Sequence, residues 1–214
     1  MIILKGLAVY FGTMNSYEGD LVVVEGIDGV GTTTVVDELK ENHYPDFNYS
    51  QEPSTGKYGQ IIREELQSDS DPTSSDFFLF CADRFDHVHS LIGPKLEQGE
   101  TVVTDRYNLS TFAYQSRVID EEMDIVDPYD YIDRIVGQFI IEPDLTILID
   151  TPVEETFERL DDDKEKYEKV ERLKDARRTY LYFAEEYDYV EVVDGTQEPE
   201  EVITDCLELI DDVI

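Results

Sequence analysis

The feature that most constrains this fold is a glycine-rich turn between a buried-strand pattern and the start of a helix. A β-branched apolar run ends at Glu25, Gly26 follows it, and Gly31 comes after four further residues. Thr33 then occupies the hydroxyl position of the phosphate-binding loop template, which runs Gly, four residues, Gly, Lys, and Ser or Thr. Such a turn directs backbone N–H groups and a helix N-terminus toward an anion. The segment therefore predicts a nucleotide phosphate site.

One position departs from that template. Thr32 stands where the lysine belongs, so the cation that normally reaches the terminal phosphates is missing from the loop. The backbone donors of the loop do not depend on that side chain. Nucleotide binding is therefore expected, and the open question is whether phosphoryl transfer survives.

Acidic side chains outnumber basic ones by 51 to 17 in 214 residues, for a formal net charge of −34. One interpretation is an acidic interaction surface or a disordered tail. The acids are spread along the chain among apolar strand and helix patterns, which favours a folded halophilic protein in a cytosol full of potassium chloride. Because no basic patch is visible, the sequence argues against a nucleic acid as partner.

We expect the melting temperature to rise between dilute buffer and molar KCl. The Debye length falls to about 3 Å near 1 M salt, so that repulsion among the acidic side chains is screened. Thermal unfolding in the two solutions measures this directly. A melting temperature that stays the same would contradict the halophilic interpretation.

Cysteines, histidines and apolar runs exclude several classes of protein. Cys81 and Cys206 lie far apart and form neither a metal spacing nor a disulfide framework, and the three histidines show no zinc pattern. No segment approaches the roughly 20 apolar residues of a membrane span. We expect inert thiols, a cytoplasmic protein and no membrane partner. Residues 1–13 are interpreted as an N-terminal extension before Met14, either an upstream extension or a start codon assigned too early.

Strand and helix patterns alternate along the rest of the chain. Strands are predicted over 21–25, 47–51, 101–105, 145–150 and 189–193. Helices are predicted over 32–42, 58–67, 73–98, 128–141, 153–186 with a break near the middle, and 199–212. This alternation predicts an α/β fold: a five-stranded, mainly parallel sheet with helices on both faces. No linker or second core is visible, so residues 14–214 form a single predicted domain.

Ligands of such sheets bind beyond the carboxyl ends of the strands. The first strand leads there into the glycine loop, and the later ones into 51–56, 105–107 and 150–152. Asp105 is the carboxylate best placed to hold Mg²⁺, with the Thr33 hydroxyl as a second ligand. Asp28 is expected to orient a second substrate or the water of the metal; the alternative is an Asx turn that stabilises the loop.

Several motifs, taken in order, resemble the thymidylate kinase family from about residue 21 to the C-terminus. They are Gly26-Ile27-Asp28-Gly29-Val30-Gly31, Glu52-Pro53, Leu79-Phe80-Cys81-Ala82-Asp83-Arg84, Asp105-Arg106-Tyr107, Ser110-Thr111-Phe112-Ala113-Tyr114-Gln115 and the strand ending at Asp150. The resemblance implies a P-loop kinase fold with a helical lid. It also implies an enzyme that transfers the γ-phosphoryl group of ATP to dTMP with Mg²⁺, as a homodimer.

The resemblance also implies roles for particular residues. Asp28, Asp105 and Arg106 are the implied catalytic residues, and Arg106 would hold the monophosphate. Implied contacts to the ATP phosphates are Gly26, Asp28, Gly29, Val30, Gly31, Thr32, Thr33 and Thr34. Implied contacts to dTMP are Glu52, Arg63, Phe80, Arg84, Arg106, Ser110, Tyr114 and Gln115. Phe80 would stack on thymine, although its surroundings alone favour a core residue.

A lid is implied at about 160–175. Its candidate cations toward the transferring phosphates are Lys164, Lys166, Lys169 and Arg172. The alternative for each is a salt bridge at helical spacing on an exposed face.

Two cations of the family pattern are absent, because Thr32 replaces the loop lysine and Gln51 stands where many members have arginine. Losing one such donor often costs about 10²–10³ in rate. A lid residue or Lys57 could replace the charge, a bound K⁺ could occupy the place with Thr32 as oxygen ligand, or the protein could be a nucleotide-binding sensor. A kinase for another deoxynucleoside monophosphate is the close runner-up. A purely structural dimer is disfavoured, because it has no evident need for Arg84, Asp105 and Arg106.

Overall fold

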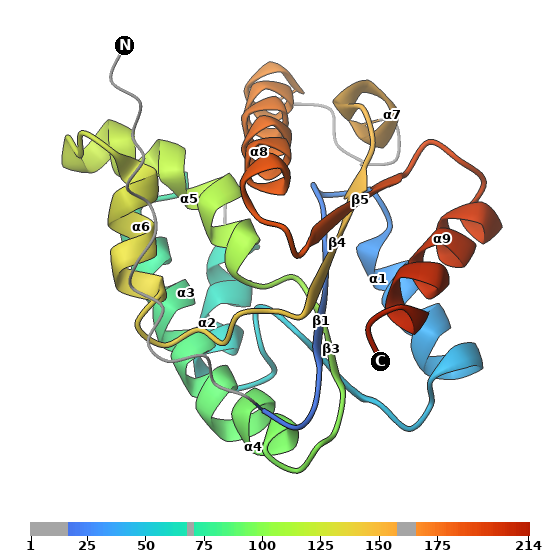
Figure 1. Ribbon diagram of the computed structural model, residues 1–214. Coiled ribbons are helices and arrows are strands. Elements are labelled where there is room, and N and C mark those ends of the chain that lie inside the picture. Colours follow the sequence, from blue (N-terminus) through green and yellow to red (C-terminus); the bar gives the residue numbers. More distant parts are fainter. Residues whose placement is uncertain (1–16, 68–70, 158–165) are drawn as a thin grey trace.

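Five parallel strands form one sheet in the computed structural model, which describes residues 17–67, 71–157 and 166–214 (Figure 1). The strands lie in the order β2-β3-β1-β4-β5. Their bounds are Leu21–Glu25 for β1, Asn48–Gln51 for β2, Val102–Asp105 for β3, Leu145–Asp150 for β4 and Val190–Asp194 for β5. The predicted five-stranded parallel sheet is confirmed.

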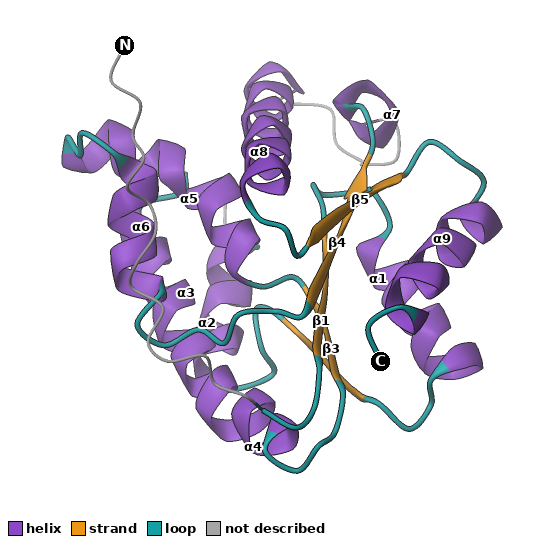
Figure 2. Cartoon of the chain, viewed as in Figure 1, coloured by secondary structure: helices purple, strands orange, loops and turns teal. Residues whose placement is uncertain are grey.

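Helices cover both faces of this sheet (Figure 2). On one face lie α1 (Thr32–Glu38), its π-helical continuation η1 (Leu39–His43) and α9 (Pro199–Asp211). The other face carries α3 (Ser74–His87), α5 (Asn108–Met123) and α8 (Lys166–Glu186), with α2 packed against α3 and α6 against α5. The remaining bounds are Lys57–Leu66 for α2, Val88–Ile92 for η2, Gly93–Leu96 for α4, Pro128–Val136 for α6 and Val153–Phe157 for α7.

The central strand β1 explains why both faces must be covered. All five of its residues are buried. Val22 and Val24 belong to the larger core cluster, whereas Leu21 and Val23 pack in a second cluster with η2 and α4. Alternate residues of a strand point to opposite faces, so a strand that is apolar throughout needs cover on both.

The helix α5 was absent from the sequence prediction, and this is its largest error. Leu109, Phe112 and Ile119 give the helix an apolar stripe, but buried polar side chains interrupt it. Those buried polar residues are Asn108, Thr111, Gln115 and Ser116. The prediction over 128–141 was also too long, because α6 ends at Val136. The prediction over 153–186, with a break near the middle, corresponds to α7 and α8; residues 158–165, which connect them, lie outside the described residues.

The sheet topology brings the sequence motifs together at the carboxyl ends of the strands. In the parallel register, Val24 of β1 and Gln51 of β2 both pair with Asp105 of β3. The glycine loop, the loop after β2 and the Arg106 turn therefore leave the sheet side by side. Among the described helices, none is long and apolar enough to cross a membrane. The predicted extension 1–13 lies outside the described residues.

Candidate active site

The glycine loop connects β1 to α1 as the sequence predicts. Gly31, the N-cap residue of α1, has a φ of 103°, a left-handed conformation that glycine adopts at little cost. Gly26 has no room for a side chain, because a Cβ there would lie 2.8 Å from the Ile149 carbonyl oxygen. Both glycines are thus required by the path of the loop, which leaves the N-terminus of α1 facing the edge of the sheet.

A hydroxyl and a carboxylate meet beside this loop. Thr33 Oγ1 donates to Asp105 Oδ2 at 2.6 Å. The second carboxylate oxygen, Asp105 Oδ1, is buried and has no hydrogen-bond partner among the described residues. Mg²⁺ prefers oxygen ligands and keeps waters or substrate phosphates in its other positions. The pair therefore fits Mg²⁺ held jointly with a nucleotide, and the described residues contain no cluster of three or more acidic, histidine or cysteine ligands.

Arg106 lies between the glycine loop and α5. Its φ of 69° is unusual for a residue with a side chain and commonly marks a functional position. Nη1 donates to the Gly26 carbonyl oxygen at 2.9 Å, and Nη2 donates to Asp28 Oδ1 at 2.8 Å. The guanidinium also lies 5.6 Å from the centre of the Tyr114 ring. Its planar fork suits bidentate recognition of a phosphate at this place.

A cavity of about 510 Å³ opens next to Arg106. Volumes of this size are typical of small-molecule sites. Asp28 lines this cavity, together with seven of the eight side chains that the resemblance implies for the acceptor: Glu52, Phe80, Arg84, Arg106, Ser110, Tyr114 and Gln115. Residues from four separate parts of the chain therefore meet in one cavity.

One wall of the cavity is a buried ion pair. Arg84 Nε and Nη2 donate to Glu52 Oε2 at 2.8 and 2.6 Å, and Nη1 donates to Thr111 Oγ1 at 2.7 Å. His87 Nδ1 lies 3.0 Å from Glu52 Oε1. Burial alone raises the pKa of Glu52, but Arg84 and His87 outweigh it and hold that pKa below its ordinary value. Glu52 is therefore ionised at neutral pH and fixes the Arg84 guanidinium in the wall.

Arg63 is the one residue implied for the acceptor that does not line this cavity. Its guanidinium donates to the carbonyl oxygens of Ser54, at 2.5 Å, and of Pro53. In this structure it supports the loop after β2. Its contact with the acceptor phosphate stays a prediction.

The implied lid cations are placed only in part. Lys164 lies outside the described residues, as do the side chains of Lys166 and Lys169. Arg172 lines the cavity and pairs with Asp71 at 3.3 Å. Thr32 is buried at the start of α1. Among the described residues, one ion pair involves the glycine loop, and it joins Arg106 to Asp28.

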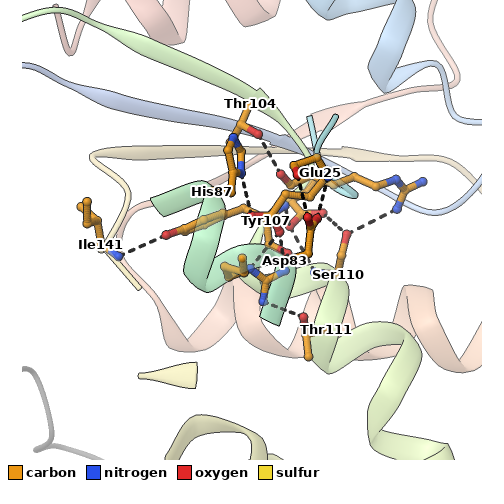
Figure 3. Close-up of polar contacts among 12 residues, drawn as sticks. Glu25, Asp83, His87, Thr104, Tyr107, Ser110, Thr111 and Ile141 are labelled. Atoms are coloured by element: carbon orange, nitrogen blue, oxygen red, sulfur yellow. Dashed lines mark hydrogen bonds and ion pairs between the residues drawn. The ribbon is translucent and has the colours of Figure 1, made fainter. Parts of the chain in front are cut away.

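Sequence reasoning missed a buried carboxylate under the site. Glu25 is fully buried and accepts hydrogen bonds from the turn that begins α5, as Figure 3 shows for Tyr107 and Ser110. Its signal was a single acid at the end of an apolar strand. Tyr180 of α8, which donates to the same carboxylate, has no distinctive signal in its helix.

Comparison with known proteins gives consistent matches. A family model described as thymidylate kinase matches residues 24–206. A probable thymidylate kinase of Methanococcoides burtonii is 35% identical over 203 residues, which cover 92% of this chain and 98% of the relative. Another, of Halorubrum lacusprofundi, is 34% identical over 197 residues, with 91% of this chain and 98% of the relative covered. A third, of Pyrobaculum aerophilum, is 36% identical over 197 residues, with 90% and 97% covered.

Proposed function

The chain belongs to the thymidylate kinase family, and we propose that it transfers the γ-phosphoryl group of ATP to dTMP, forming dTDP and ADP. The observation that carries this proposal is the cavity beside Arg106, in which seven implied acceptor residues meet. The glycine loop and the Thr33–Asp105 pair adjoin it. Donor phosphates and an acceptor phosphate can thus approach each other across Arg106.

The residues divide the work as follows. Backbone N–H groups of residues 26–34 hold the ATP phosphates at the start of α1. Thr33 and Asp105 would hold Mg²⁺, which would supply positive charge to neutralise the phosphate oxygens. Arg106 holds the acceptor phosphate with its fork, and Asp28 orients the acceptor from within the loop. Catalysis in this proposal consists of positioning and electrostatic stabilisation.

The acceptor preference rests on the polar wall of the cavity. Gln115 Oε1 is buried without a hydrogen-bond partner among the described residues, so that this carboxamide oxygen is available to a base. Arg84 has a second N–H on Nη1 beyond the one it gives to Thr111. Thymine presents a carbonyl oxygen where cytosine presents an amino group. A guanidinium donor in the wall favours the carbonyl oxygen of thymine. The amino group of cytosine would leave that buried donor unpaired, so the site discriminates strongly against cytosine.

Initial rates of ADP release with dTMP, dUMP, dGMP and dCMP test this function. The assay is run in molar KCl with Mg²⁺, and dTMP is expected to give the highest kcat/KM. A higher kcat/KM for another monophosphate would identify the runner-up kinase. Tight binding of dTMP and ATP without turnover would identify a nucleotide sensor.

We expect Thr32→Lys to change kcat by less than about tenfold, because we propose that another cation already supplies the charge near the loop. A missing donor would be worth about 10²–10³ in rate. If K⁺ is that cation, wild-type kcat should be higher in KCl than in NaCl at equal ionic strength, and Thr32→Lys should remove this difference. A rise of 10²–10³ in the variant would instead mean that the loop is defective.

We also propose a homodimer in a KCl-rich cytosol. Three apolar side chains on α2 and α3 are well exposed: Ile61 at 43%, Phe78 at 49% and Phe85 at 51%. Phe78 and Phe85 are seven residues apart and so share one face of α3, against which α2 packs. An exposed apolar surface on adjacent helices supports an interface there. Light scattering in molar KCl should give twice the chain mass of 24.7 kDa; a monomer mass would contradict the homodimer.

A further inference from the structure

The turn that carries Arg106 is held by a carboxylate from another strand. Glu25 Oε1 accepts the backbone N–H groups of Tyr107, at 2.9 Å, and Ser110, at 3.1 Å. Glu25 Oε2 accepts the Ser110 hydroxyl at 2.6 Å and the Tyr180 hydroxyl at 2.9 Å. This buried carboxylate therefore accepts four hydrogen bonds, three from the same turn and one from α8. Figure 3 shows Glu25 beside Tyr107 and Ser110.

These hydrogen bonds take the place of an N-terminal side-chain cap on α5. Tyr107 is the N-cap residue of α5 and makes no side-chain capping bond itself. Ser110 is the third residue of that helix, and its N–H is one of the donors that a capping side chain normally accepts. A carboxylate at this end also interacts favourably with the helix dipole. Glu25 therefore caps α5 from β1.

The turn that Glu25 caps also contains a residue in the left-handed backbone conformation. The left-handed Arg106 directly precedes the N-cap, and such a conformation persists only where its surroundings determine it. The Arg106 N–H donates to the Val24 carbonyl oxygen at 2.8 Å, and its carbonyl oxygen accepts from Thr104 Oγ1 at 3.1 Å. Glu25 fixes the residues that follow. The direction of the Arg106 side chain is thus set by these contacts.

Tyr180 connects this turn to α8. Its hydroxyl is 2.8 Å from Ser110 Oγ and 3.5 Å from Arg106 Nη1, in addition to its bond to Glu25. Burial raises the pKa of Tyr180 well above its ordinary value, so the hydroxyl remains a donor at neutral pH. Burial also raises the pKa of Glu25, and the hydrogen bonds from Ser110 and Tyr107 and the charge of Arg106 oppose that rise. Burying a carboxylate costs free energy unless it accepts hydrogen bonds. The donors to Glu25 belong to the turn that carries Arg106 and to α8.

We propose that Glu25 and Tyr180 are positioning residues that aim Arg106 at the acceptor phosphate. The inference rests on the proposed function, since it takes Arg106 as the phosphate ligand. It adds that the phosphate site depends on the docking of α8, through one tyrosine hydroxyl.

Tyr180→Phe tests the proposal through binding of dTMP and of thymidine, which lacks the phosphate. Wild-type protein should bind dTMP more tightly than thymidine. The variant should lower that ratio about tenfold, as expected for a lost hydrogen bond to a charged network, with thymidine and ATP affinities nearly unchanged. A purely structural role would weaken dTMP and thymidine alike.

Tyr129→Phe is the matched control. The Tyr129 hydroxyl of α6 lies 3.0 Å from Thr179 Oγ1 of α8, so this variant also removes a tyrosine hydroxyl from a helix contact of α8. It should leave the ratio of dTMP to thymidine affinity unchanged. An equal effect of both variants on that ratio, or no effect of Tyr180→Phe, would overturn the proposal. If wild-type protein bound neither ligand, the proposed function itself would fail.

Glu25 variants separate geometry from charge. In Glu25→Gln, the amide oxygen can accept both backbone N–H groups, and the NH₂ group can donate to the two hydroxyls, which rotate to accept. Glu25→Gln should therefore retain most of the affinity ratio, whereas Glu25→Ala should lose it. If Glu25→Ala does not fold, the Tyr180→Phe ratio decides. A Gln variant as impaired as Ala would contradict positioning by hydrogen bonds.

Discussion

Replacing Arg106 with glutamine is expected to lower kcat/KM for dTMP by about 10²–10³. The guanidinium lines the cavity that we propose for the acceptor and bonds to the glycine loop, through the Gly26 carbonyl oxygen and Asp28. Glutamine carries neither the charge nor the bidentate fork. It meets the same backbone penalty as arginine at a φ of 69°, so that the fold is not further strained. Steady-state rates over a range of dTMP concentrations measure the effect.

Arg106→Lys and Arg134→Gln refine that experiment. Lysine keeps the charge but loses the planar fork, so Arg106→Lys should fall between wild type and Arg106→Gln. Arg134 is 72% exposed on α6 and pairs with Asp130, so its loss removes an arginine outside the site. Arg134→Gln should leave kcat/KM unchanged. Arg106→Gln with kcat/KM within tenfold of wild type would refute the phosphate role of Arg106.

Asp105→Asn is expected to lower kcat by about 10²–10³ and to raise the Mg²⁺ concentration needed for half-maximal activity. The carboxylate has one oxygen bonded to Thr33 and the other buried without a partner among the described residues. Asparagine preserves the shape but removes the negative charge that holds a divalent cation. Rates measured over a Mg²⁺ titration report both quantities.

Asp144→Asn is the control for that substitution. Asp144 precedes β4, at the amino ends of the strands and away from the site. Its carboxylate accepts the Leu21 N–H at 2.8 Å. It should alter stability without shifting the Mg²⁺ dependence. A normal Mg²⁺ titration in Asp105→Asn would exclude Asp105 as a metal ligand.

Parts of the site could be predicted from sequence because their signals are local. The glycine loop is defined by spacing and by backbone conformations that glycine favours, and Gly31 adopts one of them. Asp105 ends an apolar strand, and the carboxyl ends of parallel strands lie together on one side of the sheet. Phe80 and Arg84 were assigned by resemblance, and the fold brings both to the same cavity as Arg106.

Other parts could not be predicted, because their partners are distant in the chain. Glu25 bonds to Ser110 and Tyr180, which are 85 and 155 residues away, and no local pattern announces such contacts. The helix α5 was missed for a related reason. This helix contains buried polar residues that form part of the cavity wall. They disrupt the apolar periodicity on which helix prediction relies.

We expect phosphoryl transfer to survive without the loop lysine. The quantity of dTDP that the unaltered protein forms from dTMP and ATP, in molar KCl with Mg²⁺, measures this. We predict repeated turnover, with dTDP and ADP formed in equal amounts and the reaction dependent on both substrates. Tight binding of dTMP and ATP with no dTDP formed would instead identify a nucleotide-binding protein without kinase activity.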